Sequence, residues 1–386
     1  MQAASKPIER SAVAPQRILL VLPESFNCAG GIQMFCRALS LAAGRWAESG
    51  GGTLDALVLN DSDAPDPRYV NGGFSSYLGA GKSKTKLIGN YLRRLLSSRY
   101  DLIILGHVFL SPLALIARVV HPAASCVVLA YGVEVWRPLN RIHRFALRHA
   151  DAVLAISEYT RDQLAKHQSA PAERIKIFPC ALDPHWQNGS AITQQHGGRP
   201  TILSVTRMNK DDRYKGIDSV IRSLPAVVEE VGPLEYLLIG EGDDLPRLRA
   251  LAAGLGVSRY VTFAGGMSEA DLRRQYERCS LFVLPSRKEG FGIVFLEAMS
   301  FRKPVVGGAH GGTPSVVSDG ETGLLVDNAD VSGISRSIIK LLSDETIQKR
   351  LGQAGYERLQ ARFTFAHFER NFRDVVQSLT EPRASR

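Results

Sequence analysis

Short apolar runs that alternate with helical segments are the feature that most constrains the fold of this chain. The candidate strands span residues 17–22, 54–59, 101–105, 125–130, 152–156, 201–205, 234–239, 260–263, 281–284, 304–307 and 323–326. Continuous apolar runs of this length, separated by helices, are typical of parallel sheets that are buried on both faces. The pattern therefore predicts an α/β protein, and in such sheets ligands bind at the carboxyl ends of the strands.

One break in this pattern predicts two domains. A polar, glycine-containing stretch at residues 188–200 separates two series of strands, and 386 residues exceed one ordinary hydrophobic core. The expected parts are a flexible lead-in (1–16), an N-terminal doubly wound domain (17–190), a C-terminal doubly wound domain (196–362) and a final helical segment (363–386) that could pack back across the domain junction.

Composition limits the location and the chemistry of the protein. No apolar run approaches the roughly 20 residues that a membrane-spanning helix needs, and the first 16 residues lack the apolar core of a signal peptide. We therefore expect a cytoplasmic protein. The cysteines are never spaced Cys-x-x-Cys, so we expect buried thiols rather than a zinc site or a disulfide framework. They are Cys28, Cys36, Cys126, Cys180 and Cys279.

The positive charge is concentrated in the N-terminal half. The net charge is +9, and residues 1–195 contribute 21 Lys and Arg against 14 Asp and Glu (+7), which leaves +2 for the rest. Such a half suggests an anionic partner, either a phospholipid surface, a lipid-diphosphate acceptor or nucleic acid. A basic face that is merely solvated explains the same excess. Nucleic acid is disfavoured, because the basic residues are not interleaved with stacking aromatic residues.

Residues 82–99 combine this charge with an apolar stripe at helical spacing. An amphipathic basic helix of this kind can lie in an anionic lipid interface. The alternative is that the same stripe packs on the N-terminal sheet and leaves its cations to water. The first alternative predicts peripheral attachment to the inner face of the membrane.

A loop between a candidate strand and a helix carries the most informative residues. It presents Glu289, then Gly290, Phe291 and Gly292, and Glu297 follows inside an apolar helix. Glycines at a helix start let the backbone approach a ligand, and the free N–H groups there favour anionic oxygens. A carboxylate accepts hydrogen bonds from two vicinal hydroxyls, so the two glutamates indicate a sugar or a ribose. For a lone pair at this spacing, helix capping and solvation would be the simpler interpretation.

Two cations and a second glycine loop add to this pattern. Arg207 and Lys215 follow the strand at 201–205, where they could neutralise a diphosphate. Two glycine pairs precede Thr313 and Pro314, a good N-cap and a good first helical residue. We therefore expect a second helix N-terminus that faces a phosphate.

Taken together, these segments resemble the C-terminal domain of the retaining GT-B glycosyltransferases of family 4, also called glycosyl transferases group 1. The segments that carry the resemblance are 204–216, 239–246, 260–267 and 284–327, with 30–31 and 131–157 in the N-terminal half. The resemblance implies two Rossmann-like domains that face each other across a cleft, with the acceptor on the first domain and the donor on the second.

The resemblance also implies a reaction. A sugar would move from a nucleoside-diphosphate sugar to a hydroxyl acceptor with retention, in polysaccharide, lipopolysaccharide or glycolipid biosynthesis. The protein would be a metal-independent hexosyltransferase without a cofactor, and its partners would be the donor, a sugar or lipid-linked acceptor and an anionic membrane surface.

Roles of individual residues follow from the same resemblance. Arg207 and Lys215 would bind the diphosphate, Glu289 would hold donor-sugar hydroxyls, and Glu297 would bind the ribose. The backbone contacts to the donor would come from Gly290, Phe291 and Gly292 at the sugar, Gly266 and Met267 at the base, and Gly30 and Gly31 at the phosphates.

The chain departs from the family pattern at several positions. Many members have a histidine near the donor sugar where this chain has Tyr131, while His107 follows the preceding strand. Either Tyr131 or His107 takes this role, or neither does. The family often has Glu in place of Ser315, and a small residue plus Gly in place of Ser300 and Phe301. These departures bear on donor and acceptor preference.

Other features of the sequence allow different interpretations. Asp61 and Asp63 form a D-x-D sequence, which glycosyltransferases of another fold use to bind a metal, but they lie in a loop with turn chemistry and we expect no metal there. A nucleotide-sugar epimerase on the same fold and a non-catalytic nucleotide-sugar-binding protein are the alternative functions. Incubation with the donor alone separates them, since an epimerase would isomerise the sugar.

Overall fold

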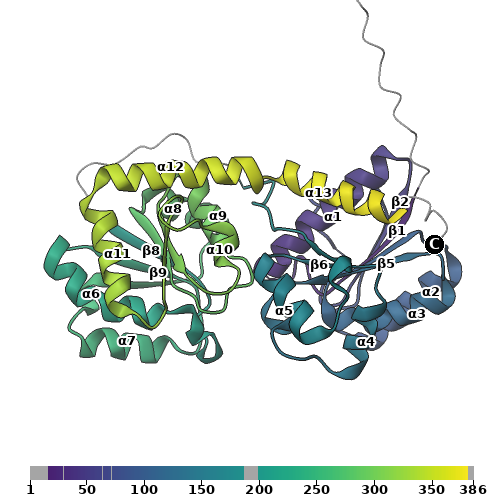
Figure 1. The fold of residues 1–386 in the computed structure, drawn as a ribbon, viewed down its shortest axis with the longest axis horizontal. Helices are drawn as coiled ribbons and strands as arrows, with labels where there is room; N and C mark the ends of the chain where they lie inside the picture. The colour runs from purple at the N-terminus through teal and green to yellow at the C-terminus, as the bar shows by residue number, and fades with distance from the viewer. Residues whose placement is uncertain (1–15, 29, 63, 71, 187–198, 381–386) are drawn as a thin grey trace, which may run out of the picture. The chain divides into compact units, whose positions relative to one another are not determined.

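The computed structural model describes residues 16–28, 30–62, 64–70, 72–186 and 199–380 (Figure 1). Two parallel sheets organise these residues. The first sheet has the order β3-β2-β1-β4-β5-β6-β7 and the second has the order β10-β9-β8-β11-β12-β13. Both are doubly wound α/β sheets, as the alternation of strands and helices predicts.

The strands agree closely with the apolar runs of the sequence. The first sheet consists of β1 (Arg17–Leu22), β2 (Thr53–Val58), β3 (Phe74–Gly79), β4 (Leu102–Leu105), β5 (Ser125–Ala130), β6 (Ala152–Ala155) and β7 (Ile175–Ile177). The second consists of β8 (Thr201–Val205), β9 (Glu235–Ile239), β10 (Val261–Gly265), β11 (Leu281–Leu284), β12 (Val305–Gly308) and β13 (Leu324–Val326). The central strands are fully buried, and this burial explains their unbroken apolar character.

Helices cover both faces of each sheet. They are α1 (Gly31–Ser49), α2 (Lys84–Ser97), α3 (Pro112–Val120), α4 (Arg141–His149), α5 (Glu158–Gln168), α6 (Ile217–Val231), α7 (Leu245–Gly254), α8 (Glu269–Arg278), α9 (Ile293–Ser300), α10 (Thr313–Val316), α11 (Val331–Ser343), α12 (Glu345–Arg362) and α13 (Phe365–Thr380). In the second sheet, α9 and α12 lie on one face, and α6, α7 and α11 lie on the other (Figure 1).

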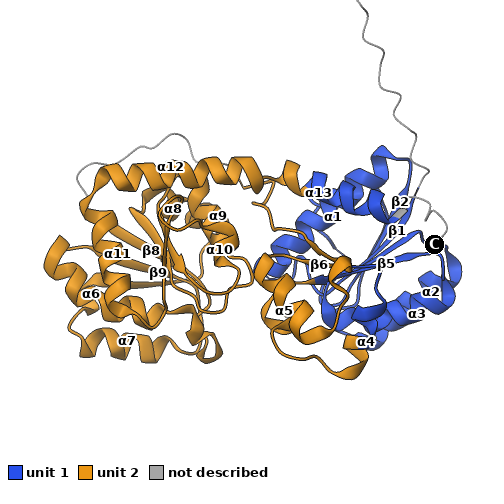
Figure 2. Ribbon diagram, in the orientation of Figure 1, with its two compact units in different colours: residues 1–129, 145–152, 369–386 blue, residues 130–144, 153–368 orange. Residues whose placement is uncertain are grey.

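The chain divides into two compact units (Figure 2). Unit 1 comprises the described residues of 1–129, 145–152 and 369–386, and unit 2 comprises those of 130–144 and 153–368. The predicted domain boundary, between residues 190 and 196, lies outside the described residues. The C-terminal part of α13 belongs to unit 1, where Leu379 accepts a hydrogen bond from Ser125 (3.0 Å) and Glu369 pairs with Arg45 (3.0 Å).

Three details differ from the sequence predictions. The strands β3 and β7 were not predicted, because β3 carries polar residues and is mostly half-buried, and β7 has only three residues. Cys28 is exposed, whereas the other four cysteines are buried as expected. The helix expected after Thr313 is the four-residue α10, which is too short to present a substantial helix dipole.

Helix α2 resolves the two alternatives for the segment at 82–99 in part. Leu87, Tyr91 and Leu95 are buried, whereas Ile88 and Leu92 on the neighbouring stripe are exposed. Packing on the sheet therefore uses only part of the apolar face. Among the described residues, no helix is long and apolar enough to cross a bilayer.

Candidate functional site

Three predicted charged residues, Arg207, Lys215 and Glu289, lie at the point where the strand order of the second sheet reverses. The chain winds outward in one direction through β8, β9 and β10, and in the other through β11, β12 and β13. Strands β8 and β11 are therefore neighbours, and Leu281 pairs in register with Ile202. Arg207 follows the carboxyl end of β8 and Glu289 follows that of β11. Doubly wound sheets bind their ligands at such a switch point.

An ion pair between Lys215 and Glu289 joins the two loops at this point. Nζ of Lys215 lies 2.6 Å from Oε2 of Glu289, and the two side chains are only 15% and 16% exposed. Lys215 ends a 3₁₀ helix (Lys210–Lys215), and Glu289 lies between β11 and α9. The structure thus brings together two residues that are 74 positions apart in the sequence. In this shielded position an uncompensated charge would be costly, so each side chain stabilises the other.

Glycines shape the backbone next to Glu289. A β-carbon at Gly290 would overlap the carbonyl oxygen of Tyr131, so only glycine allows this close approach. Gly292 has φ of 99°, in the left-handed region, and it precedes α9 without a side-chain cap. The first N–H groups of α9 are therefore left without a capping side chain, which suits an anionic ligand. Phe291 is buried and its ring packs on Phe363, so only its backbone could contact a ligand.

Glu297 lies inside α9 in a different environment. It is 5% exposed, and its Oε2 accepts a hydrogen bond of 2.7 Å from the hydroxyl of Tyr276 on α8. Burial raises the pKa of Glu297 to about 7, and the charges of Glu269 and Asp183 act in the same direction. The Tyr276 hydrogen bond opposes this rise. The pKa of Glu297 is therefore strongly perturbed, and groups with perturbed pKa values concentrate at functional sites.

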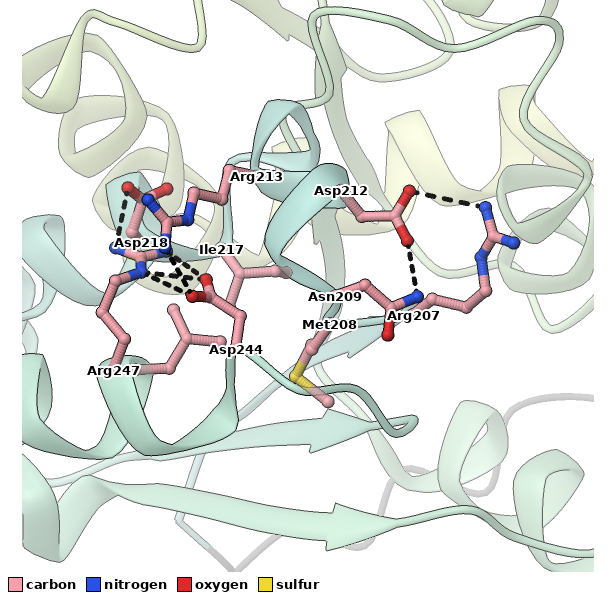
Figure 3. Close-up of a pocket in the computed structure, with 10 residues that line it drawn as sticks. Arg207, Met208, Asn209, Asp212, Arg213, Ile217, Asp218, Asp244 and Arg247 are labelled. Atoms are coloured by element: carbon pink, nitrogen blue, oxygen red, sulfur yellow. Dashed lines mark hydrogen bonds and ion pairs between the residues drawn. The ribbon is translucent and has the colours of Figure 1, made fainter.

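Arg207 is the most accessible of the predicted charged residues. Its side chain is 72% exposed and points toward Asp212, at 3.4 Å (Figure 3). Asp212 is buried and also accepts hydrogen bonds from Asn209 (3.0 Å) and Tyr214 (2.8 Å). Asp212 therefore fixes the loop from which Arg207 and Lys215 project. This role of Asp212 was not predicted from the sequence, because a lone aspartate in a polar loop has no distinctive pattern around it.

A second charged cluster, formed by Arg213, Asp244 and Arg247, also contacts the loop from Arg207 to Lys215. Asp244, before α7, accepts hydrogen bonds from Arg213 (3.0 Å) and from Arg247 (2.5 Å) (Figure 3). These contacts hold the pKa of the Asp244 carboxyl below its usual range, with the Arg247 hydrogen bond as the largest cause. The small pocket between the two clusters is lined by these paired charged and polar residues and by the apolar Met208, Ile217 and Leu248. The cluster thus anchors the Arg207–Lys215 loop to α7.

The remaining predicted donor residues lie at other strand ends. Gly266 and Met267 follow β10, and the amide of Gly266 donates to Glu241 (3.3 Å). Gly30 and Gly31 follow β1 in unit 1, where Gly31 begins α1. They lie at the switch point of the first sheet, between β1 and β4.

The two candidates for the role near the donor sugar lie in different units. His107 follows β4 in unit 1, and its Nδ1 accepts a hydrogen bond from the amide of Phe109 (3.1 Å). Tyr131 follows β5 in unit 2, where its amide donates to Glu134 (2.5 Å) and its carbonyl contacts Gly290. Burial raises the pKa of Glu134. Within unit 2, the backbone of Tyr131 therefore lies against the loop that carries Glu289 and Gly290.

The departures from the family pattern have local structural explanations. The Oγ of Ser315 donates to Glu158, so a carboxylate comes to this position from α5. Ser300 accepts a hydrogen bond from the indole of Trp186 (3.0 Å), and the ring of Phe301 packs on Trp186 and Tyr276. These residues build an aromatic cluster beside Glu297, and nothing in the local sequence pattern predicted it.

Asp61 has a structural role in unit 1. Its carboxylate accepts hydrogen bonds from the amides of Ser25, Phe26 and Asn27 and from the hydroxyl of Tyr77 (2.7 Å). Asp63 lies outside the described residues. Within the described parts of the chain, no three His, Cys, Asp or Glu side chains are grouped closely enough to hold a metal ion.

Comparison with known proteins identifies the family. The model of glycosyl transferases group 1 matches residues 189–358, and that of the glycosyl transferase 4-like domain matches residues 41–181. The chain is 32% identical over 273 residues to a GDP-mannose-dependent alpha-(1-6)-phosphatidylinositol monomannoside mannosyltransferase of Mycobacterium tuberculosis, over 66% of this chain and 70% of the relative.

Solved structures agree with the same fold. Sucrose-phosphate synthase from Thermosynechococcus elongatus superposes with a TM-score of 0.74 at 21% identity, over 94% of this chain and 99% of the other. HepE from Anabaena, in complex with UDP and glucose, gives a TM-score of 0.74 at 18% identity over 94% and 100%. The chain therefore belongs to the glycosyl transferases group 1, the family 4 glycosyltransferases with the GT-B fold, which use nucleoside-diphosphate sugars as donors.

Proposed function

We propose that this protein transfers a hexosyl group from a nucleoside-diphosphate sugar to a hydroxyl of a lipid-linked acceptor, with retention of the anomeric configuration. The observation that carries the proposal is the shielded Lys215–Glu289 pair at the switch point, beside the uncapped start of α9. The relative from Mycobacterium tuberculosis is named for GDP-mannose and for a phosphatidylinositol mannoside. GDP-mannose is therefore the first donor to test.

The ion pair suggests how the donor would be held. In the free protein each of the two charges compensates the other. A bound diphosphate would take over Lys215, and the hydroxyls of the donor sugar would donate to Glu289, since a carboxylate accepts several hydrogen bonds. The exchange replaces one partner by another, so neither charge is left uncompensated.

The other donor contacts follow the same logic. Arg207 is exposed and would reach the diphosphate as it leaves the sugar, while Glu297 would accept hydrogen bonds from the ribose. Gly266 and Met267 would contact the base, and Gly30 and Gly31 would approach the phosphates. The arginine, the lysine and the amides of α9 supply the positive charge, so the proposed reaction needs no metal ion or other cofactor.

The reaction would depend mainly on stabilising the leaving group. Negative charge develops on the diphosphate as the bond to the sugar breaks, and preorganised cations and amides are worth several kcal/mol in this work. The acceptor hydroxyl would arrive on the face that the diphosphate leaves, and a phosphate oxygen would take its proton. Tyr131, whose backbone contacts the donor loop, is the stronger of the two candidates for the position beside the sugar.

A donor screen tests this function directly. UDP-, GDP- and ADP-sugars are compared by thermal shift, because a ligand that binds the folded state raises its apparent stability. The selected donor is then incubated with a lipid-linked acceptor, and the anomeric configuration of the product is read by NMR. We expect a product with the configuration of the donor. An isomerised donor in the absence of acceptor, or an inverted product, would contradict the proposal.

We also propose that unit 1 attaches peripherally to an anionic membrane surface. Among the described residues of unit 1, the exposed large apolar side chains are Ile88, Leu92, Leu96, Phe109, Val119 and Phe145. On α2, Ile88, Leu92 and Leu96 recur every four residues and are 43%, 39% and 80% exposed. They form an exposed stripe beside the buried stripe of Leu87, Tyr91 and Leu95. The apolar face of α2 is therefore wider than the part of it that is buried.

Cations on α2 favour an anionic lipid as the partner of this stripe. Lys84, Lys86 and Arg93 are exposed on the same helix, and the helix carries no acidic residue. Each cation near an anionic bilayer contributes about 1 kcal/mol at low salt, and the stripe adds the burial of apolar side chains in the interface. A bilayer surface would also bring the enzyme to a lipid-linked acceptor.

Vesicle flotation tests the attachment. We expect binding to phosphatidylglycerol-containing vesicles at low salt and weaker binding at high salt or to pure phosphatidylcholine. Reversal of Lys84, Lys86 and Arg93 to Glu should abolish it. The control reverses Arg336, Lys340 and Lys349, which are equally exposed on α11 and α12, and should still bind. Loss of binding in both variants alike would contradict an attachment through α2.

A further inference from the structure

Tyr276 makes the hydrogen bond that orients Glu297. The tyrosine is fully buried, its hydroxyl donates to Oε2 of Glu297 at 2.7 Å, and the bond joins α8 to α9. Among the described residues, Oε1 of Glu297 has no hydrogen-bond partner. The carboxylate is thus held through one oxygen, and the other oxygen is available to accept a hydrogen bond.

The ring of Tyr276 is itself held in place from several sides. It stacks on Phe301 at 6.2 Å with an interplanar angle of 7°, and Trp186 meets it edge-on at 5.9 Å. Phe282 of β11 packs against it at 5.8 Å. Because aromatic rings packed in this way cannot change rotamer without opening the core, the position of the hydroxyl is fixed.

Trp186, in the loop after β7, and Ser300, at the end of α9, connect this aromatic cluster to the backbone of Glu297. Trp186 donates its indole N–H to Ser300 (3.0 Å), and Ser300 donates in turn to the backbone carbonyl of Glu297 (2.6 Å). Trp186 therefore touches the backbone of Glu297 through one serine, and it touches Tyr276 by its ring. The aromatic cluster holds both the main chain and the side chain of Glu297.

We propose that Tyr276 is a positioning residue for the donor ribose, because its hydroxyl fixes the Glu297 carboxylate with one oxygen turned to the ribose hydroxyls. This inference rests on the proposed contact between Glu297 and the ribose. A carboxylate that accepts one hydrogen bond from the protein loses less rotational freedom when it accepts the next from a ligand. Preorganisation of this kind raises affinity by lowering the cost of ordering. Tyr276 itself does not touch the donor.

A purely structural role for Tyr276 is the competing explanation. The Tyr276–Glu297 bond also ties α8 to α9, and its loss could loosen the whole domain. The two explanations predict different effects on ligands with and without the ribose hydroxyls. A positioning effect concerns only the ribose hydroxyls, whereas a loosened domain weakens every ligand of the site.

The test therefore uses two probes, GDP and 2′,3′-dideoxy-GDP, in binding titrations with the full chain. Tyr276→Phe removes the hydroxyl and keeps the ring. We expect it to weaken GDP about tenfold, the typical cost of one hydrogen bond to a charged group, and to leave the dideoxy analogue unchanged. On a Glu297→Gln background the same substitution should have no further effect, because the two residues act as one unit.

A matched control comes from unit 1. The hydroxyl of Tyr100 also donates to a buried carboxylate at 2.7 Å, that of Asp55, so Tyr100→Phe removes the same bond elsewhere in the protein. It should leave GDP binding unchanged. Two results would overturn the positioning role of Tyr276 and leave the ribose contact of Glu297 intact. In the first, Tyr276→Phe weakens the binding of both probes equally. In the second, Glu297→Gln weakens the binding of GDP and Tyr276→Phe does not. A Glu297→Gln variant that binds GDP as the wild type does overturns the proposed ribose contact itself.

Discussion

The two sheets of this protein have the same winding but offer different chemistry at the same place. In each, the strand order reverses between the first and the fourth strand of its series, between β1 and β4 or between β8 and β11. The second switch point carries a shielded Lys–Glu pair and an exposed arginine. The first carries Gly30, Gly31 and His107 and no comparable ion pair among its described residues. Topology therefore predicts where a ligand binds, and side chains decide which ligand.

The surfaces of the two regions differ as well. The first sheet and the helices around it expose large apolar side chains, with Leu96 at 80%, while the described residues from 199 to 368 expose none of this class. The positive charge follows the same division, since residues 1–195 hold most of the excess. These differences agree with the proposals that the second switch point binds the donor and that the region around α2 binds an anionic surface.

The largest effect is expected at the second switch point. Lys215→Ala removes the cation that is paired with Glu289 and should lower kcat at least about a hundredfold, as removal of one preorganised charge from a leaving-group site does. Lys349→Ala, which removes an exposed lysine paired with Glu345 at 2.7 Å, is the control and should not change kcat. His107→Ala should cost less than Lys215→Ala. A larger loss at His107 would break the comparison between the two sheets.

The two glutamates of the donor site should separate turnover from binding. Glu289→Ala should lower kcat more than it raises KM, because the sugar it contacts changes charge in the transition state. Glu297→Ala should instead raise the KM of the donor about tenfold through the lost ribose contact. Steady-state kinetics with the selected donor distinguish the two. Equal and small changes in both parameters for both variants would contradict the assignment.

Donor affinity should rise with pH across neutrality. Glu297, with its pKa raised to about 7 by burial, faces Tyr276, Glu269 and Asp183. If only its ionised form accepts from the ribose, affinity increases about tenfold from pH 6 to pH 8. Isothermal titration at several pH values measures this slope, and Glu297→Gln should flatten it. A slope that persists in the variant would point to another group.

The stability of the free protein should change in the opposite sense. The folded pKa of Glu297 lies above its ordinary value of 4.5, so the folded state holds a proton that the unfolded chain has lost. This contribution to stability is complete below pH 4.5 and is lost as the pH rises through about 7. Denaturant unfolding of the wild type and of Glu297→Gln separates it from the titration of other groups.

The smallest effect is expected from metal removal. The carboxylate of Asp61 is occupied by three backbone amides and a tyrosine hydroxyl, so it is committed to the loop after β1 rather than to an ion. Activity should therefore be unchanged by EDTA. A loss that Mg²⁺ or Mn²⁺ restores would contradict this prediction and would direct attention to Asp61 and Asp63.

The sequence was sufficient for the sheets and for the main charged residues of the site. Buried parallel strands are continuous apolar runs, so β1, β5, β8 and β11 were predicted with their observed ends. The edge strand β3 was missed because its partly exposed residues are polar. Lys215 and Glu289 were both selected, but their pairing depends on the adjacency of β8 and β11, which no local pattern reports.

The residues that contact Glu297 could not be predicted either, because these contacts also depend on how distant segments pack together. Tyr276 lies 21 positions before Glu297 and Trp186 lies 114 positions before Ser300. These contacts form only when α8, α9 and the loop after β7, which carries Trp186, meet in the folded chain. Side-chain type and spacing predict the charged groups of a site, whereas the residues that hold those groups in place become visible only in three dimensions.

Hydrogen–deuterium exchange of the full chain, with and without the nucleoside diphosphate of the selected donor, shows where the donor binds. If the donor is held at the switch point of the second sheet, the amides of residues 290–294 at the start of α9, and those of the loop from Arg207 to Lys215, should be protected on binding. Helix amides that bind phosphate oxygens exchange more slowly, because they are hydrogen-bonded to the ligand. Protection confined to the loops after β1 and β4, with the α9 start and the Arg207–Lys215 loop unchanged, would show that the donor does not bind at the second switch point.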